Sequence, residues 1–228
     1  MFTKPFLCLT LLTSAKKRIF VYMKRMGYRF LCTPWIWLRR FRKRRGYGVH
    51  SPFAFNFITG VVYERGTYYA YSHLDKRHNV WVRMLRLRPL MCSRLLFRVA
   101  NYVSPDELWM WKVTELDKDY LQSGCVSAQA IDAEESAMNS IKNSGEKKIM
   151  LLFFAAEEGG EKVYENLQGR LAEGSAVVVE GIGSCPCAAR LWNVIRQDER
   201  VGATFDLYDY GIVFYDPKRN NQHYVVNF

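Results

Sequence analysis

The C-terminal half of the chain alternates short apolar runs with amphipathic segments, and this alternation restricts the fold more than any other feature. The clearest runs are KIMLLFFA at residues 148–155 and AVVV at 176–179. Each is followed by a segment of helical periodicity, at 161–171 and 187–196. Continuous apolar runs are typical of strands buried on both faces. Strands and helices in alternation predict an α/β fold with a mostly parallel sheet.

Weaker signals complete this α/β pattern. Strands are expected at 108–113 and 126–131, and a helix at 133–142. A long strand at 203–214, interrupted at residues 209–211, and a final strand at 223–228 are joined by the turn DPKRNNQ and predict an antiparallel hairpin at the C-terminus.

Helices are expected to precede the sheet. Ser51 is a good N-cap and Pro52 suits the first helical position, where its missing N–H costs nothing. The apolar residues of this helix recur every four positions, at Phe53, Phe57 and Val61. Gly66 marks its expected end, and residues 73–104 predict one or two further helices.

Positive charge is concentrated in an N-terminal arm. The 63 residues before the first acid, Glu64, carry 13 of the 33 Lys and Arg, so the formal net charge of +11 belongs to the arm and the remainder is nearly neutral. We therefore divide the chain into a basic aromatic arm at 1–45, a helical part at 46–104 and a Rossmann-like domain at 105–228. Met23 and Met26 are alternative start positions. If the protein starts at one of them, the residues before it are a mis-assigned part of the arm.

Aromatic side chains alternate with Lys and Arg through residues 16–45, which leaves three interpretations of the arm. Its aromatic side could dock on the chain's own domain while its charges face water. It could instead lie on an anionic membrane surface. It could also follow a nucleic-acid backbone.

Six cysteines in a chain large enough for a substantial core do not indicate a disulfide framework, and we expect a reduced, cytoplasmic setting. Cys185 and Cys187 are interpreted as two ordinary thiols at the start of a helix, because the remaining ligands of a zinc site are lacking nearby. No metal is predicted. No apolar stretch approaches the roughly 20 residues that span a bilayer, so any membrane contact would be peripheral, at the inner face.

Three motifs carry a family resemblance. They are RGYGVHSPFAFNFITGVVYE at 45–64, LLFRVANYVSP at 95–105 and DLYDYGIVFYDPKRNNQHYVVNF at 206–228. With their HSPF segment and GIVFF-like ending, they resemble a family of bacterial proteins, common in Bacteroidetes, identified as class I S-adenosylmethionine-dependent methyltransferases. The resemblance covers about residues 45–104 and 146–228. It implies a Rossmann-like methyltransferase sheet, mostly parallel, with a C-terminal antiparallel hairpin and preceding helices.

The family's cofactor motifs are altered in this chain. A glycine-rich turn of the form E-I-G-T-x-x-G follows the first strand in the family, but here the stretch ELWMWKVTELDKDYL at 107–121 contains no glycine. Trp109, Trp111 and Lys112 are expected to occupy the turn region. A third family motif, of the form F-x-D-G-N-H, corresponds to FFAAEE at 153–158, and the position of its acid is Ala155 here.

The acids left at the expected strand ends are the candidate cofactor-binding residues: Asp132, Glu157 with its neighbour Glu158, and Glu180. Gly181 and Gly183 could form a tight turn near a ligand. His50 precedes a helix N-cap, a position that suits a structural hydrogen bond better than proton transfer. No catalytic residue is assigned.

These observations favour a degenerate methyltransferase-like protein that binds S-adenosylmethionine weakly or not at all. One alternative is an active class I methyltransferase whose divergent site uses the three acids. The other is a membrane-surface or nucleic-acid adaptor that works through its basic arm. An unknown small molecule, or none, would be the ligand of the globular part.

Overall fold

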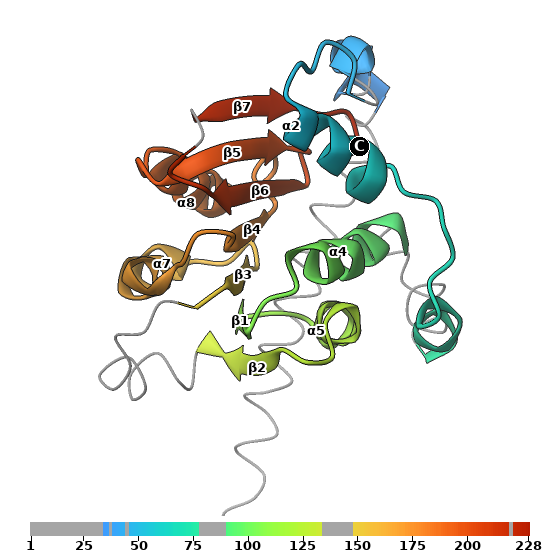
Figure 1. Ribbon diagram of the computed structural model, residues 1–228, viewed down its shortest axis with the longest axis vertical. Coiled ribbons are helices and arrows are strands. Elements are labelled where there is room, and N and C mark those ends of the chain that lie inside the picture. Colours follow the sequence, from blue (N-terminus) through green and yellow to red (C-terminus); the bar gives the residue numbers. More distant parts are fainter. Residues whose placement is uncertain (1–33, 37, 44–45, 78–89, 134–147, 219–220) are drawn as a thin grey trace, which may run out of the picture.

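The computed structural model of the chain describes residues 34–36, 38–43, 46–77, 90–133, 148–218 and 221–228. Within these ranges seven strands form one sheet in the order β2-β1-β3-β4-β6-β5-β7 (Figure 1). The strands are β1 (Glu107–Trp111), β2 (Gln129–Asp132), β3 (Met150–Phe154), β4 (Ala176–Glu180), β5 (Val201–Asp206), β6 (Tyr210–Tyr215) and β7 (Gln222–Val225). Only β6 runs antiparallel to its neighbours.

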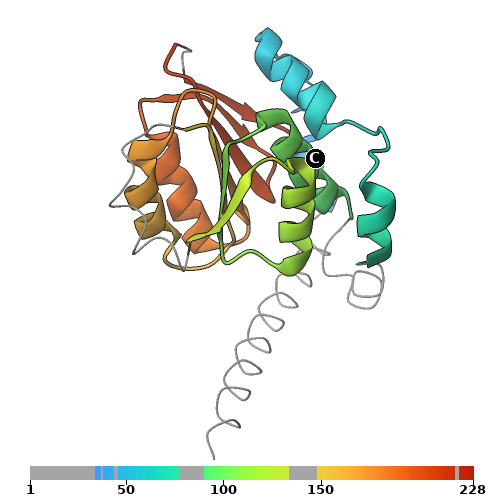
Figure 2. The same cartoon turned by 60° about the horizontal axis from the view of Figure 1, so that its bottom comes forward.

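Helices cover both faces of the sheet, as Figure 2 shows. One face carries α2 (Pro52–Phe57), a π-helical turn (Ile58–Val62), α4 (Leu90–Val103) and α5 (Glu115–Gly124). The other carries α7 (Gly160–Leu167), a 3₁₀ turn (Gln168–Arg170) and α8 (Pro186–Arg196). The predicted α/β fold, Rossmann-like and mostly parallel, is confirmed. None of the helices in the described ranges combines the length and apolar character needed to cross a bilayer.

The buried strands divide their side chains between the two cores. Leu151 and Phe153 of β3 face α2, α4 and α5, whereas Leu152 and Phe154 face α7 and α8. Alternation along a strand sends successive side chains to opposite faces. A strand covered on both sides must therefore be apolar at every position, which explains the continuous runs in the sequence.

The first helix forms as predicted at its beginning. The Ser51 side chain accepts a hydrogen bond from the Ala54 N–H at 3.4 Å, and the Phe57 ring packs 4.6 Å from the ring of Phe205. The helical segment ends at Val62, four residues before the predicted end at Gly66.

The last turn of this segment is stabilised from outside by Arg98 of α4, which is 6% exposed. Its guanidinium donates to the carbonyl oxygens of Val61 at 2.6 Å and Val62 at 3.1 Å. These are carbonyls that a helix end leaves without an intrahelical partner. Arg98 therefore secures the N-terminal helical segment to α4.

The helix α5 was missed in the sequence. Thr114 is its N-cap: the hydroxyl donates to the Asp117 carboxylate at 2.6 Å and accepts from the Asp117 N–H at 3.3 Å. This T-x-x-D pattern is a shortened form of the capping box. At its other end Gly124 lies against α4, where an added Cβ would be 2.3 Å from the Phe97 carbonyl oxygen.

The C-terminal hairpin exists, but its predicted position is wrong. The run 203–214 is two strands, β5 and β6, which reverse direction through residues 207–209. The Asp206 carboxylate accepts from the Tyr208 N–H at 2.8 Å, and Tyr208 has a φ of +69°. The turn DPKRNNQ instead leads to β7, which pairs parallel with the outer side of β5.

Candidate functional site

Six parallel strands direct their C-terminal ends to the same edge of the sheet. Strands β2 and β3 lie on opposite sides of β1, so the topological switch point is between β1 and β3. Ligands of open α/β sheets bind in the crevice at such a point. The residues that follow β1 and β3 are therefore the first candidates for a site.

Lys112 occupies the position directly after β1, with a φ of +50°. This left-handed conformation is one that glycine adopts at little cost and other residues adopt rarely. The Lys112 ammonium lies 5.0 Å from the centroid of the Trp111 ring. A long side chain therefore projects from a backbone position that favours glycine.

The Trp111 indole lies where α7 begins. An added Cβ on Gly159, which has a φ of +96°, would be 3.3 Å from the indole, and one on Gly160 would be 3.7 Å from it. These two glycines therefore leave the space that the ring fills. The indole N–H is buried, and among the described residues none accepts its hydrogen bond.

Trp109, in contrast, does not reach the turn, and this part of the sequence prediction is wrong. It lies within β1, is 2% exposed and points toward α7. Its indole N–H donates to the Glu107 carboxylate at 2.8 Å, and the Arg170 guanidinium lies 5.2 Å from its ring centroid. Only Trp111 and Lys112 stand at the strand end.

The three predicted acids all lie at the C-terminal edge but on separate strands. Asp132 is exposed at the end of β2, Glu157 is half-buried two residues beyond Ala155, and Glu180 is half-buried at the end of β4. Because β1 and β3 stand between β2 and β4, ~14 Å of sheet separates Asp132 from Glu180. The carboxylates therefore form no single cluster. No group of three or more His, Cys, Asp or Glu suited to a metal ion occurs in the described part of the chain.

The glycine turn after β4 is present, and protein atoms fill the space around it. Gly181 has a φ of +75°, and an added Cβ would be 2.8 Å from the Ala156 Cβ. At Gly183 an added Cβ would be 2.5 Å from the Tyr208 ring. Because these two glycines lack a side chain, the loops that carry Ala156 and Tyr208 can pack closely against them. His50, outside this edge, lies exposed just before the Ser51 cap.

A disulfide joins Cys185 to Cys187, so the interpretation of these residues as two thiols is wrong. The predicted helix start is confirmed: Cys185 is the N-cap of α8 and Pro186 takes the first helical position. Cysteine spacing alone did not reveal the bond, because two thiols and a disulfide can share the same sequence. Cys92, which is buried, and Cys125, which is half-buried, take no part in this bond.

The described end of the basic arm docks on the sheet through an arginine. Both terminal nitrogens of the Arg40 guanidinium contact the Asp206 carboxylate at 3.0 Å, and Arg40 also lies 5.4 Å from the Tyr208 ring centroid. One of the three interpretations of the arm put its aromatic side chains against the domain, but in the described part Trp35 is 64% exposed and Phe41 48%.

A pocket of about 310 Å³ opens where the arm meets the edge of β5 and β7. Its lining combines aromatic, apolar and cationic side chains: Trp35, Ile36, Arg39, Arg40, Lys43, Tyr208 and Val225. Small-molecule pockets begin at about this size. No sequence signal pointed to it, because its two walls are more than 160 residues apart along the chain.

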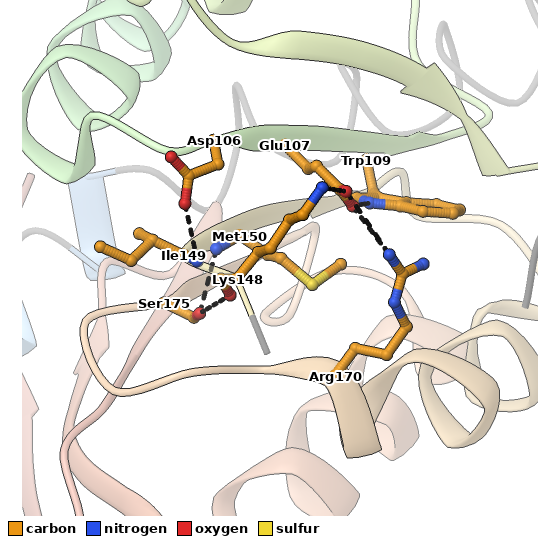
Figure 3. Close-up of polar contacts among 8 residues, drawn as sticks. All are labelled: Asp106, Glu107, Trp109, Lys148, Ile149, Met150, Arg170 and Ser175. Carbon is orange, nitrogen blue, oxygen red and sulfur yellow. Dashed lines mark hydrogen bonds and ion pairs between the residues drawn. The ribbon is translucent and has the colours of Figure 1, made fainter. Parts of the chain in front are cut away.

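A second polar cluster lies at the opposite, N-terminal edge of β1 and β3 (Figure 3). The Glu107 carboxylate, 5% exposed, accepts from Lys148 at 3.0 Å and from Arg170 at 3.2 Å, besides Trp109. Burial would raise the pKa of Glu107, but hydrogen bonds from Trp109 and Lys148 and the nearby positive charges outweigh it. The pKa of this carboxyl therefore lies below its ordinary value.

Backbone contacts complete this cluster. The Asp106 carboxylate accepts from the Ile149 N–H at 3.2 Å, and the Ser175 hydroxyl accepts from the Met150 N–H at 3.0 Å. The side chains in Figure 3 thus join the beginnings of β1, β3 and β4. Since the Glu107 and Asp106 carboxylates and the Ser175 hydroxyl accept from groups of the same cluster, at the edge away from the crevice, we assign this cluster a structural role.

The strand order and the helices on both faces define an α/β protein with a Rossmann-like sheet. No protein-family model and no curated protein matches the chain.

Proposed function

We propose that this chain is a methyltransferase-like protein with a degenerate cofactor site, which binds S-adenosylmethionine weakly or not at all and acts by binding another partner. The observation that carries the proposal is Lys112. It stands in a left-handed conformation within the turn region in which the family resemblance implies glycines.

The physical argument concerns close approach. A glycine turn lets a cofactor contact the backbone, whereas a lysine in the same conformation projects a four-carbon chain from that point. Ala155 stands where the family has an acid, and Trp111 packs beside it: the Ala155 N–H donates to the Trp111 carbonyl oxygen at 3.1 Å. These features together support a crevice filled by the protein's own groups.

Isothermal titration of the full chain with S-adenosylmethionine and with S-adenosylhomocysteine tests the proposal. We expect no saturable heat up to roughly 100 μM ligand. Micromolar binding of either compound would overturn it and favour an active methyltransferase with a divergent site. In that case Asp132→Asn should weaken binding, and Glu199→Gln, at an exposed acid just before β5 and away from the C-terminal edge, should serve as the unaffected control.

A second candidate function, binding to an anionic membrane surface, is favoured by the docked end of the arm. Arg40 is neutralised by Asp206, but Arg39 and Lys43 are exposed beside the exposed ring of Trp35. Cations next to an aromatic ring suit the interface between headgroups and acyl chains. This function would place the protein in the cytoplasm, peripheral to the inner face of the membrane.

Cosedimentation with vesicles separates this candidate from nucleic-acid binding. We expect binding to phosphatidylserine-containing vesicles, none to neutral vesicles, and a loss of binding between 50 and 200 mM salt. The double change Arg39→Ala/Lys43→Ala should weaken binding several-fold, and Lys218→Ala, an exposed cation at another turn, should not. Binding to DNA instead of vesicles would show that the arm binds nucleic acid. Equal vesicle binding by both variants would show that Arg39 and Lys43 play no part.

A further inference from the structure

The disulfide between Cys185 and Cys187 encloses a single residue, Pro186. The two Cα atoms are 5.5 Å apart. Helix α8 begins at Pro186, so one sulfur belongs to its N-cap and the other to its first turn. Both cysteines lie in the connection that follows β4, at the C-terminal edge of the sheet.

Such a short loop gives the bond little structural purpose. A disulfide stabilises a fold mainly by restricting the unfolded chain, and the effect grows with the length of the loop that it closes. This bond joins two residues of one connection and ties no separate elements together. Helix α8 is already anchored by side chains in the core, namely Ala188, Leu191, Trp192 and Ile195.

The surroundings of the two sulfurs instead suit thiol–disulfide exchange. Cys187 is half-buried and can be reached by a small thiol, whereas Cys185 is 8% exposed. The unpaired N–H groups and dipole of a helix N-terminus favour a thiolate over a thiol. The Ala156 carbonyl oxygen, 3.7 Å from the Cys185 sulfur, can accept its S–H after reduction.

We propose that Cys185 and Cys187 form a reversible redox pair that exchanges with a low-molecular-weight thiol. A thiolate of this compound attacks the Cys187 sulfur; the intramolecular S–S bond breaks, and its electrons pass to the Cys185 sulfur, which takes a proton from water. A second thiolate then attacks the outer sulfur of the mixed disulfide and releases the Cys187 thiolate. The two thiolates become one disulfide, and the protein gains two electrons and, once water has protonated the released Cys187 thiolate, two protons.

This inference does not depend on the proposed methyltransferase-like function, because S-adenosylmethionine takes no part in it. In reducing compartments, disulfides of mesophilic proteins are usually transient and serve catalysis or redox sensing. A reversible pair therefore agrees with the cytoplasmic setting expected from the cysteine content, whereas a permanent bond would not.

The test is redox equilibration of the folded full chain in mixtures of reduced and oxidised glutathione at pH 7. After acid quenching and alkylation, intact mass gives the fraction of dithiol. The controlling quantity is the squared concentration of reduced glutathione divided by the concentration of oxidised glutathione. We expect the dithiol fraction to rise from about a tenth to nine-tenths as this quantity increases roughly a hundredfold. The double variant Cys185→Ser/Cys187→Ser should lose the transition, and Cys125→Ser should keep it at the same ratio.

Two results would overturn the proposal. The disulfide would be structural if it resisted reduction at every ratio, or if its reduction abolished the near-ultraviolet circular dichroism. The cysteines would be two ordinary thiols if they stayed reduced at every ratio. A rate measurement provides a second check. In the reduced protein at pH 6, Cys187 should react with iodoacetamide at least about tenfold faster than Cys125, and equal rates would contradict an activated thiol.

Discussion

Replacement of Glu107 by Gln tests whether its carboxylate holds the beginnings of β1 and β3 together. The carboxylate is 5% exposed and Arg170, one of its partners, is 13% exposed, so the change leaves a cation largely buried without its counter-charge. Breaking a buried pair from one side costs about 3–5 kcal/mol. Here Lys148 is 35% exposed and can turn to water, and Gln retains an acceptor for Trp109. We therefore expect the free energy of unfolding to fall by about 2–3 kcal/mol at pH 7.

The same change should alter the pH dependence of stability. The pKa of Glu107 is lower in the folded protein than in the unfolded chain. Its contribution is thus fully present above about pH 4.5 and is lost as the pH falls through the folded-state pKa. The difference between the wild type and Glu107→Gln should therefore be largest at neutral pH and shrink below pH 4.

Equilibrium urea unfolding at pH 7 and at pH 3.5 gives both quantities. A double variant, Glu107→Gln/Arg170→Met, keeps the packing over Trp109 without the buried charge and should recover at least half of the loss. A loss below about 0.5 kcal/mol at pH 7, typical of surface substitutions, would refute the reasoning. So would a loss of the same size at both pH values.

Three further predictions concern the backbone and the arm. Lys112→Gly relieves a left-handed conformation and should raise the free energy of unfolding by about 1 kcal/mol, whereas Lys118→Gly inside α5 should lower it by about 1 kcal/mol. Urea unfolding that ranks the two variants in the opposite order would show that Lys112 is not strained. Gly124→Ala places a Cβ against α4 and should lower the melting temperature, because the free energy of unfolding falls by about 2 kcal/mol or more. At Gly169 an added Cβ meets nothing within 4 Å, so Gly169→Ala should change the melting temperature little, and equal shifts would contradict the close contact at Gly124. Arg40→Ala should make the arm more accessible to trypsin by several-fold, and an unchanged cleavage rate would show that its ion pair does not hold the arm.

Elements were predictable where neighbouring residues alone determine them. The apolar runs of β3 and β4 and the Ser51 cap lie within a few positions of one another, and the structure confirms them. The helix α5 was missed although its T-x-x-D cap is also local. Interpreted as an altered cofactor turn, this stretch does not predict a helix, although it contains the capping pattern.

The candidate site was predictable only as far as the edge on which it lies. Parallel strands bring Asp132, Glu157 and Glu180 to one edge, but the distance between them depends on the strand order, which local patterns do not contain. The ring of Trp111 fills space that two glycines of another segment leave open. That complementarity is a property of the packed structure.

The sequence by itself determined the α/β class and the contrast between a basic N-terminal part and a nearly neutral remainder. These depend on periodicity and composition, which are readable along the chain. Only the tertiary structure decided that β7 joins β5, that Arg40 meets Asp206 166 residues away, and that Cys185 and Cys187 are bonded. The physical reason is that a contact between distant segments depends on the path of the whole chain, and a bond between near neighbours depends on the local geometry and redox state of their side chains.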